Sequence, residues 1–268
     1  MATIMAVHAH PDDEATSTGG ILARYAAEGH TTVLVTCTNG ELGDLPGGVK
    51  PGEDGHDAAA VVSHRMAELR ESCRILNVTH LELLGYRDSG MEEWEHKDHP
   101  EAFWTVPLAE SAAKLAALME HYQPDVVVTY NEYGFYGHPD HIQANRITRA
   151  ALDQVPTSKL YYTAVPTSRL LGFAAAMAEQ GIDGPFDEEE IRRIGTPDEL
   201  IGAVVDVGAF ARAKYDALAA HASQTESSFF LEMGPELFAA AFGNEAFVRV
   251  HDATGQEGVE DDLLAGIA

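Results

Sequence analysis

A nearly continuous apolar run at residues 2–7 ends directly in a cluster of two histidines and three carboxylates at residues 8–14. Continuous rather than alternating apolar character is typical of a central parallel strand that is covered on both faces. Similar runs follow at residues 31–36, 81–84 and 125–130. Because parallel strands need long crossover connections, this pattern restricts the chain to an α/β fold with helices on both faces of a sheet.

The segments between these runs show the helical periodicity that crossover connections require. Residues 18–28 place apolar side chains at helical spacing and end at Gly29, and residues 58–76 and 107–122 show the same period. Right-handed crossovers in the common doubly wound order predict the strand order 3-2-1-4. We therefore predict a Rossmann-like three-layer α/β sandwich with a mostly parallel sheet.

A chain of 268 residues without a linker or a repeat period is predicted to form a single domain over residues 1–268. We expect its core at about residues 1–165 and a C-terminal extension at about residues 166–268. Beyond the fourth strand, the sequence predicts strands at 159–165, 201–207 and 246–250, and helices at 168–180 and 210–221. The acidic segment at 187–193 is predicted to be an exposed, solvated surface.

Two segments have the form His-Pro-Asp followed by one more ligand-type residue, although 128 positions separate His10 from His138. In the predicted strand order, the carboxyl ends of strands one and four are neighbours, so His10, Asp13, His138 and His141 can converge there. Imidazole nitrogen and carboxylate oxygen suit a borderline ion such as Zn²⁺. Either segment alone has a second interpretation as a helix cap. Together they predict a metal site.

Three other features near this edge of the sheet have simpler interpretations. His8 is predicted to be a hydrogen-bonded core histidine rather than a ligand, because side chains alternate across a strand. The glycine-bearing loop at 38–44 loosely resembles a phosphate cradle, but its spacing fits neither the dinucleotide fingerprint nor a P-loop. His96 and His99 lie among acids at 92–104, which favours an exposed lid over a second metal site.

Charge and cysteine content limit the partners and the compartment. The formal net charge of −26, from 17 basic and 43 acidic residues, would repel phosphate backbones and anionic membranes, so we expect neither nucleic acid nor a membrane as a partner. The sequence shows no signal-peptide pattern and no apolar stretch of 18 residues, which predicts a cytoplasmic protein. Cys37 and Cys73 are predicted to be buried thiols. The oligomeric state stays open between a monomer and a homo-oligomer.

The two motifs, Ala9-His10-Pro11-Asp12-Asp13-Glu14 and Tyr136-Gly137-His138-Pro139-Asp140-His141, resemble the LmbE/PIG-L family of metal-dependent N-deacetylases, especially its mycothiol branch. The likeness extends to further segments: Thr36 to Asp44, Arg65, Arg87 to Met91, His221 to Gln224 and Asp262 to Gly266. The resemblance implies hydrolysis of the acyl amide of an N-acetylglucosamine-type substrate, such as N-acetylglucosaminyl-inositol. It leaves two alternatives within the family, amide cleavage of mycothiol S-conjugates and deacetylation of a secondary metabolite.

By this resemblance, His10, Asp13 and His141 are the zinc ligands and Asp12 is the general base. Three protein ligands leave one coordination position for water, whose pKa Zn²⁺ can bring to about 7. Fe²⁺ suits the same donor set, so the sequence does not choose between the two ions. A non-catalytic metal-binding protein on the same fold is the alternative of a different class. Because such a protein would not need Asp12, the presence of this carboxylate favours hydrolysis.

The remaining site residues follow from the same resemblance. His138 and Tyr136 match positions that stabilise the oxyanion, although Tyr136 has a second interpretation as packing only. Asp140 is expected to hold the ring of His138, or only to begin a helix. His221 is interpreted as structural or at the rim of the pocket. Three further residues match positions that contact the sugar or inositol: Asp44, Arg65 and Asp88. Substrate choice is expected to lie in loops 44–57, 88–104 and 180–200.

Overall fold

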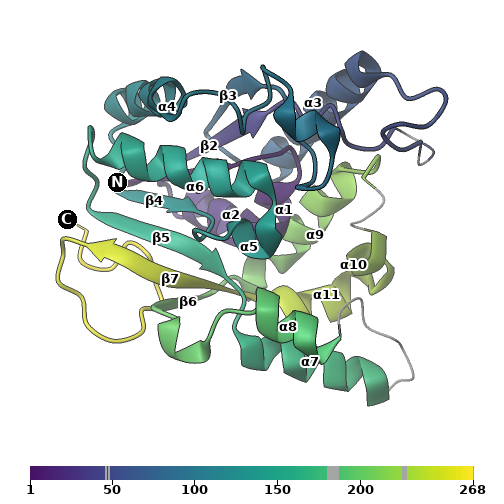
Figure 1. Ribbon diagram of the computed structural model, residues 1–268. Coiled ribbons are helices and arrows are strands. Elements are labelled where there is room, and N and C mark those ends of the chain that lie inside the picture. Colours follow the sequence, from purple (N-terminus) through teal and green to yellow (C-terminus); the bar gives the residue numbers. More distant parts are fainter. Residues whose placement is uncertain (46, 48, 180–186, 225–227, 268) are drawn as a thin grey trace.

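The structure is a computed structural model that describes all residues except 46, 48, 180–186, 225–227 and 268 (Figure 1). The described residues form a seven-stranded sheet in the order β3-β2-β1-β4-β5-β7-β6. Its strands are β1 (Thr3–His8), β2 (Thr31–Thr38), β3 (His80–Tyr86), β4 (Val126–Thr129), β5 (Lys159–Ala164), β6 (Ala203–Asp206) and β7 (Asn244–Asp252). Strands β1 to β5 pair in parallel, and β7 pairs antiparallel with β5 and β6. The predicted order 3-2-1-4 and the mostly parallel sheet are therefore confirmed.

Helices cover both faces of the sheet, which confirms the three-layer sandwich (Figure 1). Helices α4 (Leu108–Tyr122) and α6 (Pro139–Leu152) pack on the face that carries Met5 and Val7. Helices α2 (Gly19–Ala27), α3 (Ala58–Ile75) and α9 (Ala211–Ala220) pack on the face that carries Ala6 and Leu34. Because successive side chains of a strand point to opposite faces, one continuous apolar run supplies both cores.

Several short elements complete the described part of the chain. The helices are α1 (Asp13–Ser17), α5 (Gly134–Gly137), α7 (Thr167–Glu179), α8 (Glu188–Ile194), α10 (Ser228–Glu232) and α11 (Gly234–Phe242). The 3₁₀ turns are η1 (Glu95–Asp98), η2 (Asp198–Leu200) and η3 (Gly208–Phe210). None of the described helices combines the length and the apolar character needed to cross a membrane. Cys37 and Cys73 are buried and unpaired, as predicted.

The acidic segment at 187–193 is more than solvated surface, because it forms α8. Its acids are largely exposed, as expected, but Asp187 and Glu190 form a capping box at the helix start. Acids occupy the first turn and Arg192 and Arg193 the last, an order that suits the helix dipole. Ile191 is buried beneath them. The part of the expected 180–200 loop that covers residues 180–186 lies outside the described residues.

The C-terminal part of the chain joins the same sheet through β6 and β7. After β7, the buried Glu260 forms an ion pair with the buried Lys159 at the start of β5. Leu263 is fully buried against the strands, and its N–H donates to the hydroxyl oxygen of Tyr25 on α2 at 2.9 Å. The end of the chain therefore packs against both β5 and α2. The division into a core and an extension stays a prediction.

We expect Leu263→Ala to lower the free energy of unfolding by about 2–5 kcal/mol, the usual effect of truncating a buried leucine. The side chain has no exposed surface, so its loss leaves a cavity beneath the sheet. Urea denaturation followed by circular dichroism measures the change. Val259→Ala is the control, since Val259 is 64% exposed four residues earlier. Equal unfolding free energies for both variants would contradict the packing role of the C-terminal segment.

Candidate active site

Strand pairing brings the two sequence motifs to one place. β1 and β4 are adjacent and parallel, with Ala6 aligned to Val128. Residues 10–13 follow the carboxyl end of β1 and enter α1, while residues 138–141 follow β4 and begin α6. Parallel strands end at the same edge of a sheet, so the motifs meet there as predicted.

The carboxylate of Asp13 lies between two imidazoles. Its Oδ2 is 3.4 Å from His10 Nδ1, and its Oδ1 is 3.4 Å from His141 Nε2. A tetrahedral zinc ion with bonds of about 2.0–2.2 Å separates its ligand atoms by about 3.3–3.5 Å. All three side chains are largely buried. The two distances involve different oxygens of Asp13, so the structure places His10, Asp13 and His141 together, and their role as the ligand set stays a prediction.

Two features of these residues favour a cation at this point. Both ring nitrogens of His141 are buried without a hydrogen-bond partner, while its ring stacks on Tyr130 with centroids 4.1 Å apart. Burial would lower the pKa of His10, but the carboxylates of Asp88 and Asp13 outweigh it and hold this pKa well above its usual value. The site thus stabilises a positive charge, and His141 has a ring nitrogen that is available to bind a cation.

Asp140 contacts His10, which corrects the expectation that its carboxylate holds the ring of His138. Asp140 Oδ2 lies 3.2 Å from His10 Nε2 and accepts a hydrogen bond from the backbone N–H of Ser89 at 2.9 Å. The Ser89 hydroxyl donates to Asp140 Oδ1 at 2.5 Å. A carboxylate on the outer nitrogen of an imidazole directs the other nitrogen toward a metal. Asp140 therefore orients His10 Nδ1 toward Asp13.

His138 is close enough to be considered as a ligand, because one nitrogen each of His10, His138 and His141 lie within 4.8 Å of one another. Its Nδ1, however, accepts the backbone N–H of Asp140 at 3.1 Å at the start of α6. Burial, together with the neighbouring His10, holds the pKa of His138 far below its usual value, so the ring is neutral. A neutral imidazole that accepts at Nδ1 carries its proton on Nε2. His138 therefore offers a donor, and Asp13 is the better third ligand.

Asp12 has a strained backbone and a restrained carboxylate. Its φ of 117° lies in the left-handed region, which costs on the order of 1–3 kcal/mol for a residue other than glycine. Asp12 Oδ2 accepts from the guanidinium of Arg65 at 2.9 Å. Burial raises the pKa of Asp12 to about 6 against the opposing charge of Arg65. A carboxylate of this pKa is suited to general-base work near neutral pH.

The glycine-bearing loop at 38–44 accommodates Arg65. A Cβ atom on Gly40 would lie 2.6 Å from Arg65 Nη1, and one on Gly43 would lie 2.5 Å from the same atom. The carbonyl of Gly40 accepts from Arg65 Nη1 at 2.9 Å, and that of Pro11 accepts from Nη2. The glycines thus allow the close approach of a buried guanidinium to the motif after β1.

Tyr136 lies at the open side of this cluster and is 43% exposed. It belongs to α5, in which Phe135 has a positive φ of 65°. Its ring centroid lies 5.3 Å from that of His141 and 6.0 Å from that of His138, edge to face in both pairs. The structure therefore brings Tyr136 to the two histidines of the second motif, as the sequence predicted.

The three expected substrate residues are all near the site, and all are largely buried. Arg65 is 4% exposed and contacts Asp12, so the structure gives it a partner within the protein. Asp88 is also 4% exposed, and its Oδ1 lies 3.7 Å from His10 Nε2. The backbone N–H and carbonyl of Asp44 are bonded to the side chain of Gln224. Contact of these residues with a sugar stays a prediction.

The other histidines near the sheet edge have the following positions. His8 is fully buried, with Nε2 2.8 Å from the Thr18 hydroxyl and Nδ1 3.2 Å from that of Tyr130, which confirms its interpretation as a core histidine. His96 is exposed and His99 is half-buried, on either side of the end of η1. Neither belongs to the groups of candidate ligands found among the described residues. The lid role of 92–104 stays a prediction.

Sequence reasoning missed three residues that support the site. Tyr130, directly after β4, stacks on His141 and accepts from the Ala9 N–H at 2.9 Å. Ser89 bonds the Asp140 carboxylate, and the fully buried Glu14 accepts from the Asp12 N–H at 3.0 Å. Glu14 directly follows the candidate site residues Asp12 and Asp13, and this position was the sequence signal available for it. Tyr130 had no local signal, because its partners lie 11 or more residues away in the sequence. Ser89 lies in the matched segment Arg87 to Met91, but its partner Asp140 is 51 positions away.

The doubly wound sheet places this chain in the class of Rossmann-like α/β proteins, with buried histidine and aspartate residues that could hold a metal ion at the ends of β1 and β4. The chain belongs to the PIG-L family, whose model, described as GlcNAc-PI de-N-acetylase, matches residues 5–152. This match covers β1 to α6 and therefore both motifs. The family resemblance inferred from the motifs is confirmed.

Known proteins are similar to this chain over most of its length. A 1D-myo-inositol 2-acetamido-2-deoxy-alpha-D-glucopyranoside deacetylase of Salinispora arenicola is 40% identical over 283 residues, covering 98% of this chain and 91% of that protein. The solved N,N'-diacetylchitobiose deacetylase of Pyrococcus horikoshii has a TM-score of 0.60 at 19% identity, covering 92% of this chain and 83% of that one. A 4-carboxy-2-hydroxymuconate hydratase of Pseudomonas putida reaches 0.64 at 18%, covering 96% and 100%. These two structural similarities show the fold alone.

Proposed function

We propose that this protein is a metal-dependent deacetylase that hydrolyses the acetamide of an N-acetylglucosaminyl-inositol. The observation that carries the proposal is the 40% identity over nearly the whole chain to a relative with that name. The site supports it, because a carboxylate, a neutral histidine and a ligand cluster lie together at one sheet edge. The hydratase on a similar fold shows that the sheet alone does not decide the reaction.

His10, Asp13 and His141 would hold the ion in this proposal. A bound Zn²⁺ or Fe²⁺ would supply Lewis-acid polarisation of the acyl carbonyl and would lower the pKa of water. Asp140 fixes the ring of His10 through its outer nitrogen. Two imidazoles and one carboxylate are a donor set of both catalytic Zn²⁺ and non-haem Fe²⁺, so metal analysis of the purified protein decides between the two ions.

The chain's own residues account for proton transfer and charge stabilisation. Asp12, with its pKa raised by burial, takes a proton from the attacking water and later gives it to the leaving amine. The neutral His138 directs Nε2–H toward the site, since its Nδ1 accepts from the backbone. That N–H is suited to stabilise the oxyanion that develops from the carbonyl, with the Tyr136 hydroxyl as a second donor.

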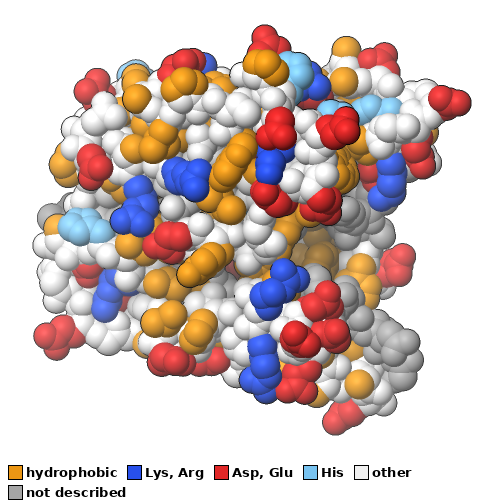
Figure 2. All heavy atoms as spheres, viewed as in Figure 1, with side chains coloured by type: hydrophobic (Ala, Val, Ile, Leu, Met, Phe, Trp, Pro, Cys, Tyr) orange, Lys and Arg blue, Asp and Glu red, His pale blue; other side chains and the backbone are white. Residues whose placement is uncertain are grey.

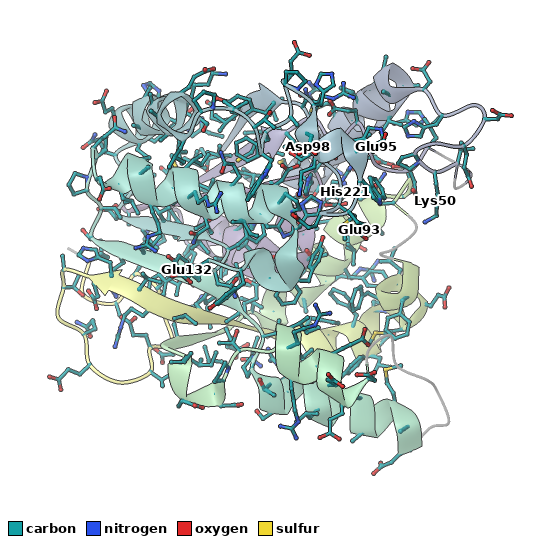
Figure 3. The ribbon with its side chains drawn as sticks, in the orientation of Figure 1. Lys50, Glu93, Glu95, Asp98, Glu132 and His221 are labelled. Atoms are coloured by element: carbon teal, nitrogen blue, oxygen red, sulfur yellow. The ribbon has the colours of Figure 1, made fainter. Side chains whose placement is uncertain are left out.

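Charge around the site favours an uncharged polyol as the part of the substrate beyond the sugar. Acidic side chains are spread over the face in Figure 2, and Figure 3 labels three exposed ones, Glu93, Glu95 and Asp98, at and beside η1. The guanidinium of Arg65 is already engaged with Asp12. These carboxylates accept hydrogen bonds from hydroxyl groups and repel phosphate. The net charge of −26 acts in the same direction, so we infer that inositol without a phosphodiester is the preferred aglycone.

We expect N-acetylglucosaminyl-inositol to have a higher kcat/KM than free N-acetylglucosamine, because a site that hydrogen-bonds hydroxyls discriminates against substrates that lack them. Amine release measured by mass spectrometry on both compounds gives the ratio. A water-soluble phosphodiester analogue of the first compound is the charge control and should be the poorer of the two inositol substrates. Equal or better efficiency on the free sugar, on a mycothiol conjugate or on an antibiotic-type acyl amine would overturn this assignment.

A further inference from the structure

The strained conformation of Asp12 is maintained by a neighbouring carboxylate. Glu14 lies two residues further on in α1, and its Oε2 accepts the Asp12 N–H at 3.0 Å. The Asp12 carbonyl in turn accepts the N–H groups of Ala15 and Thr16 as α1 begins. A left-handed non-glycine residue persists only where its surroundings determine it fully. Glu14 contributes to maintaining this conformation, because its carboxylate binds the backbone N–H of Asp12 itself.

Glu14 is itself held from two distant parts of the chain. Its Oε1 lies 2.7 Å from His221 Nε2 and accepts from the Ser72 hydroxyl at 2.5 Å. Both members of the pair with His221 are essentially unexposed. A carboxylate oxygen only accepts hydrogen bonds, so Nε2 of His221 carries the proton in this contact. The imidazole therefore donates to a carboxylate that has no access to water.

His221 reaches this place because the segment 221–224 docks beside the site. It follows α9, and Ser223 donates to Glu68 of α3 through both its N–H and its hydroxyl. Gln224 bonds the backbone of Asp44. Figure 3 labels His221 within the body of the molecule, directly after the end of α9. The segment lies outside the part of the chain that the family model matches, residues 5–152.

We propose that Glu14 and His221 are positioning residues that hold Asp12 in its productive conformation, so that the C-terminal half of the chain completes the catalytic site. The proposal rests on the role of Asp12 given under Proposed function. The chain of contacts runs from His221 Nε2 through the two oxygens of Glu14 to the Asp12 N–H. Neither residue touches the substrate in this scheme, and both act through the orientation of one carboxylate.

The test compares three substitutions at His221 and in its segment. His221→Leu removes the donor to Glu14 and should lower kcat by about 10²-fold, the cost of a misplacement of about 1 Å. We expect unchanged KM and an unchanged metal content by mass spectrometry of the metal. His221→Gln keeps a donor at the position of Nε2 and should retain most of the activity. Ser223→Ala loosens the same segment without touching Glu14 and should leave kcat unchanged.

The kcat values of the three variants distinguish a positioning role of His221 from a general effect on folding. A fall in kcat for Ser223→Ala as large as that for His221→Leu would overturn the proposal, because segment docking alone would then explain both. An equal fall for Gln and Leu at position 221 would also overturn it, since the donor would not matter. Circular dichroism of each purified variant shows whether it is folded before its rate is measured.

A double-substitution cycle separates this proposal from the proposed function. If His221 acts through Asp12, His221→Leu should cause no further fall in kcat in the Asp12→Asn background. A full additional fall there would overturn the positioning role while leaving Asp12 as the base. Full activity of Asp12→Asn alone would instead remove the base assignment, and it is measured without any change at His221.

Discussion

Replacing His10 or His141 by alanine should remove the bound divalent ion and the deacetylase activity together. Each histidine places a nitrogen 3.4 Å from an oxygen of Asp13, so each loss removes one of three proposed ligands. Changes in residues that only support a ligand typically cost about 10–100-fold in metal affinity or activity. We expect the loss of a direct ligand to exceed that range. Metal analysis of the purified variants, with the rate measured on the same samples, checks this result.

The variant His138→Ala tests whether His138 belongs to the set of metal ligands. Because its Nδ1 accepts the Asp140 N–H, its proton is on Nε2, and the variant should keep the ion while losing activity. His251→Ala, at an exposed histidine of β7, should keep both. Loss of the ion from His138→Ala would place His138 in the ligand set instead of Asp13. Full metal occupancy in both His10→Ala and His141→Ala would remove the assignment altogether.

The order of the sheet was predictable because the central strands are buried on both faces. The runs at 2–7, 31–36 and 125–130 each contain at least three consecutive apolar residues, and their ends lie within two residues of those of β1, β2 and β4. The helices at 228–242 were not predicted, because apolar residues follow one another there almost without interruption and no helical period stands out. α8 was missed for a related reason. The charge pattern at 187–193 is typical of a capped helix and equally of a solvated segment, so the sequence did not distinguish the two.

The candidate site was predictable where its residues are close in sequence, and less so where they meet through the fold. His10, Asp13 and His141 are found from two short motifs and the strand order. The partner of Asp140 was wrong, because proximity in sequence favours His138 whereas the carboxylate turns toward His10, 130 positions away. Arg65 was expected at the sugar because it matches a family position that contacts the sugar or inositol. Its burial depends on glycines that cluster about 25 positions earlier, and spacing alone does not reveal that contact.

The second large effect is expected at Asp12. Asp12→Asn should keep the metal and lose about 10²–10⁴-fold in kcat, the usual contribution of a general base. Asparagine is the informative replacement, because it tolerates a positive φ better than alanine and still offers Arg65 an oxygen. The variant therefore removes the proton acceptor and leaves the backbone and the guanidinium contact in place. Single-turnover rates with metal content measured in parallel check the prediction.

Arg65 supplies the comparison that shows whether charge or proton transfer is lost in Asp12→Asn. Arg65→Lys keeps a positive charge beside Asp12 but cannot reach Asp12, Pro11 and Gly40 with one planar group. If Asp12 moves protons, this variant should lose activity through misplacement of the carboxylate, and its loss should be smaller than that of Asp12→Asn. Near-normal kcat in metal-loaded Asp12→Asn would transfer the base role to another group. Because His138 is neutral with its proton on Nε2, it has no free nitrogen for that role, and the search would turn to Asp88 and Glu41 next to it.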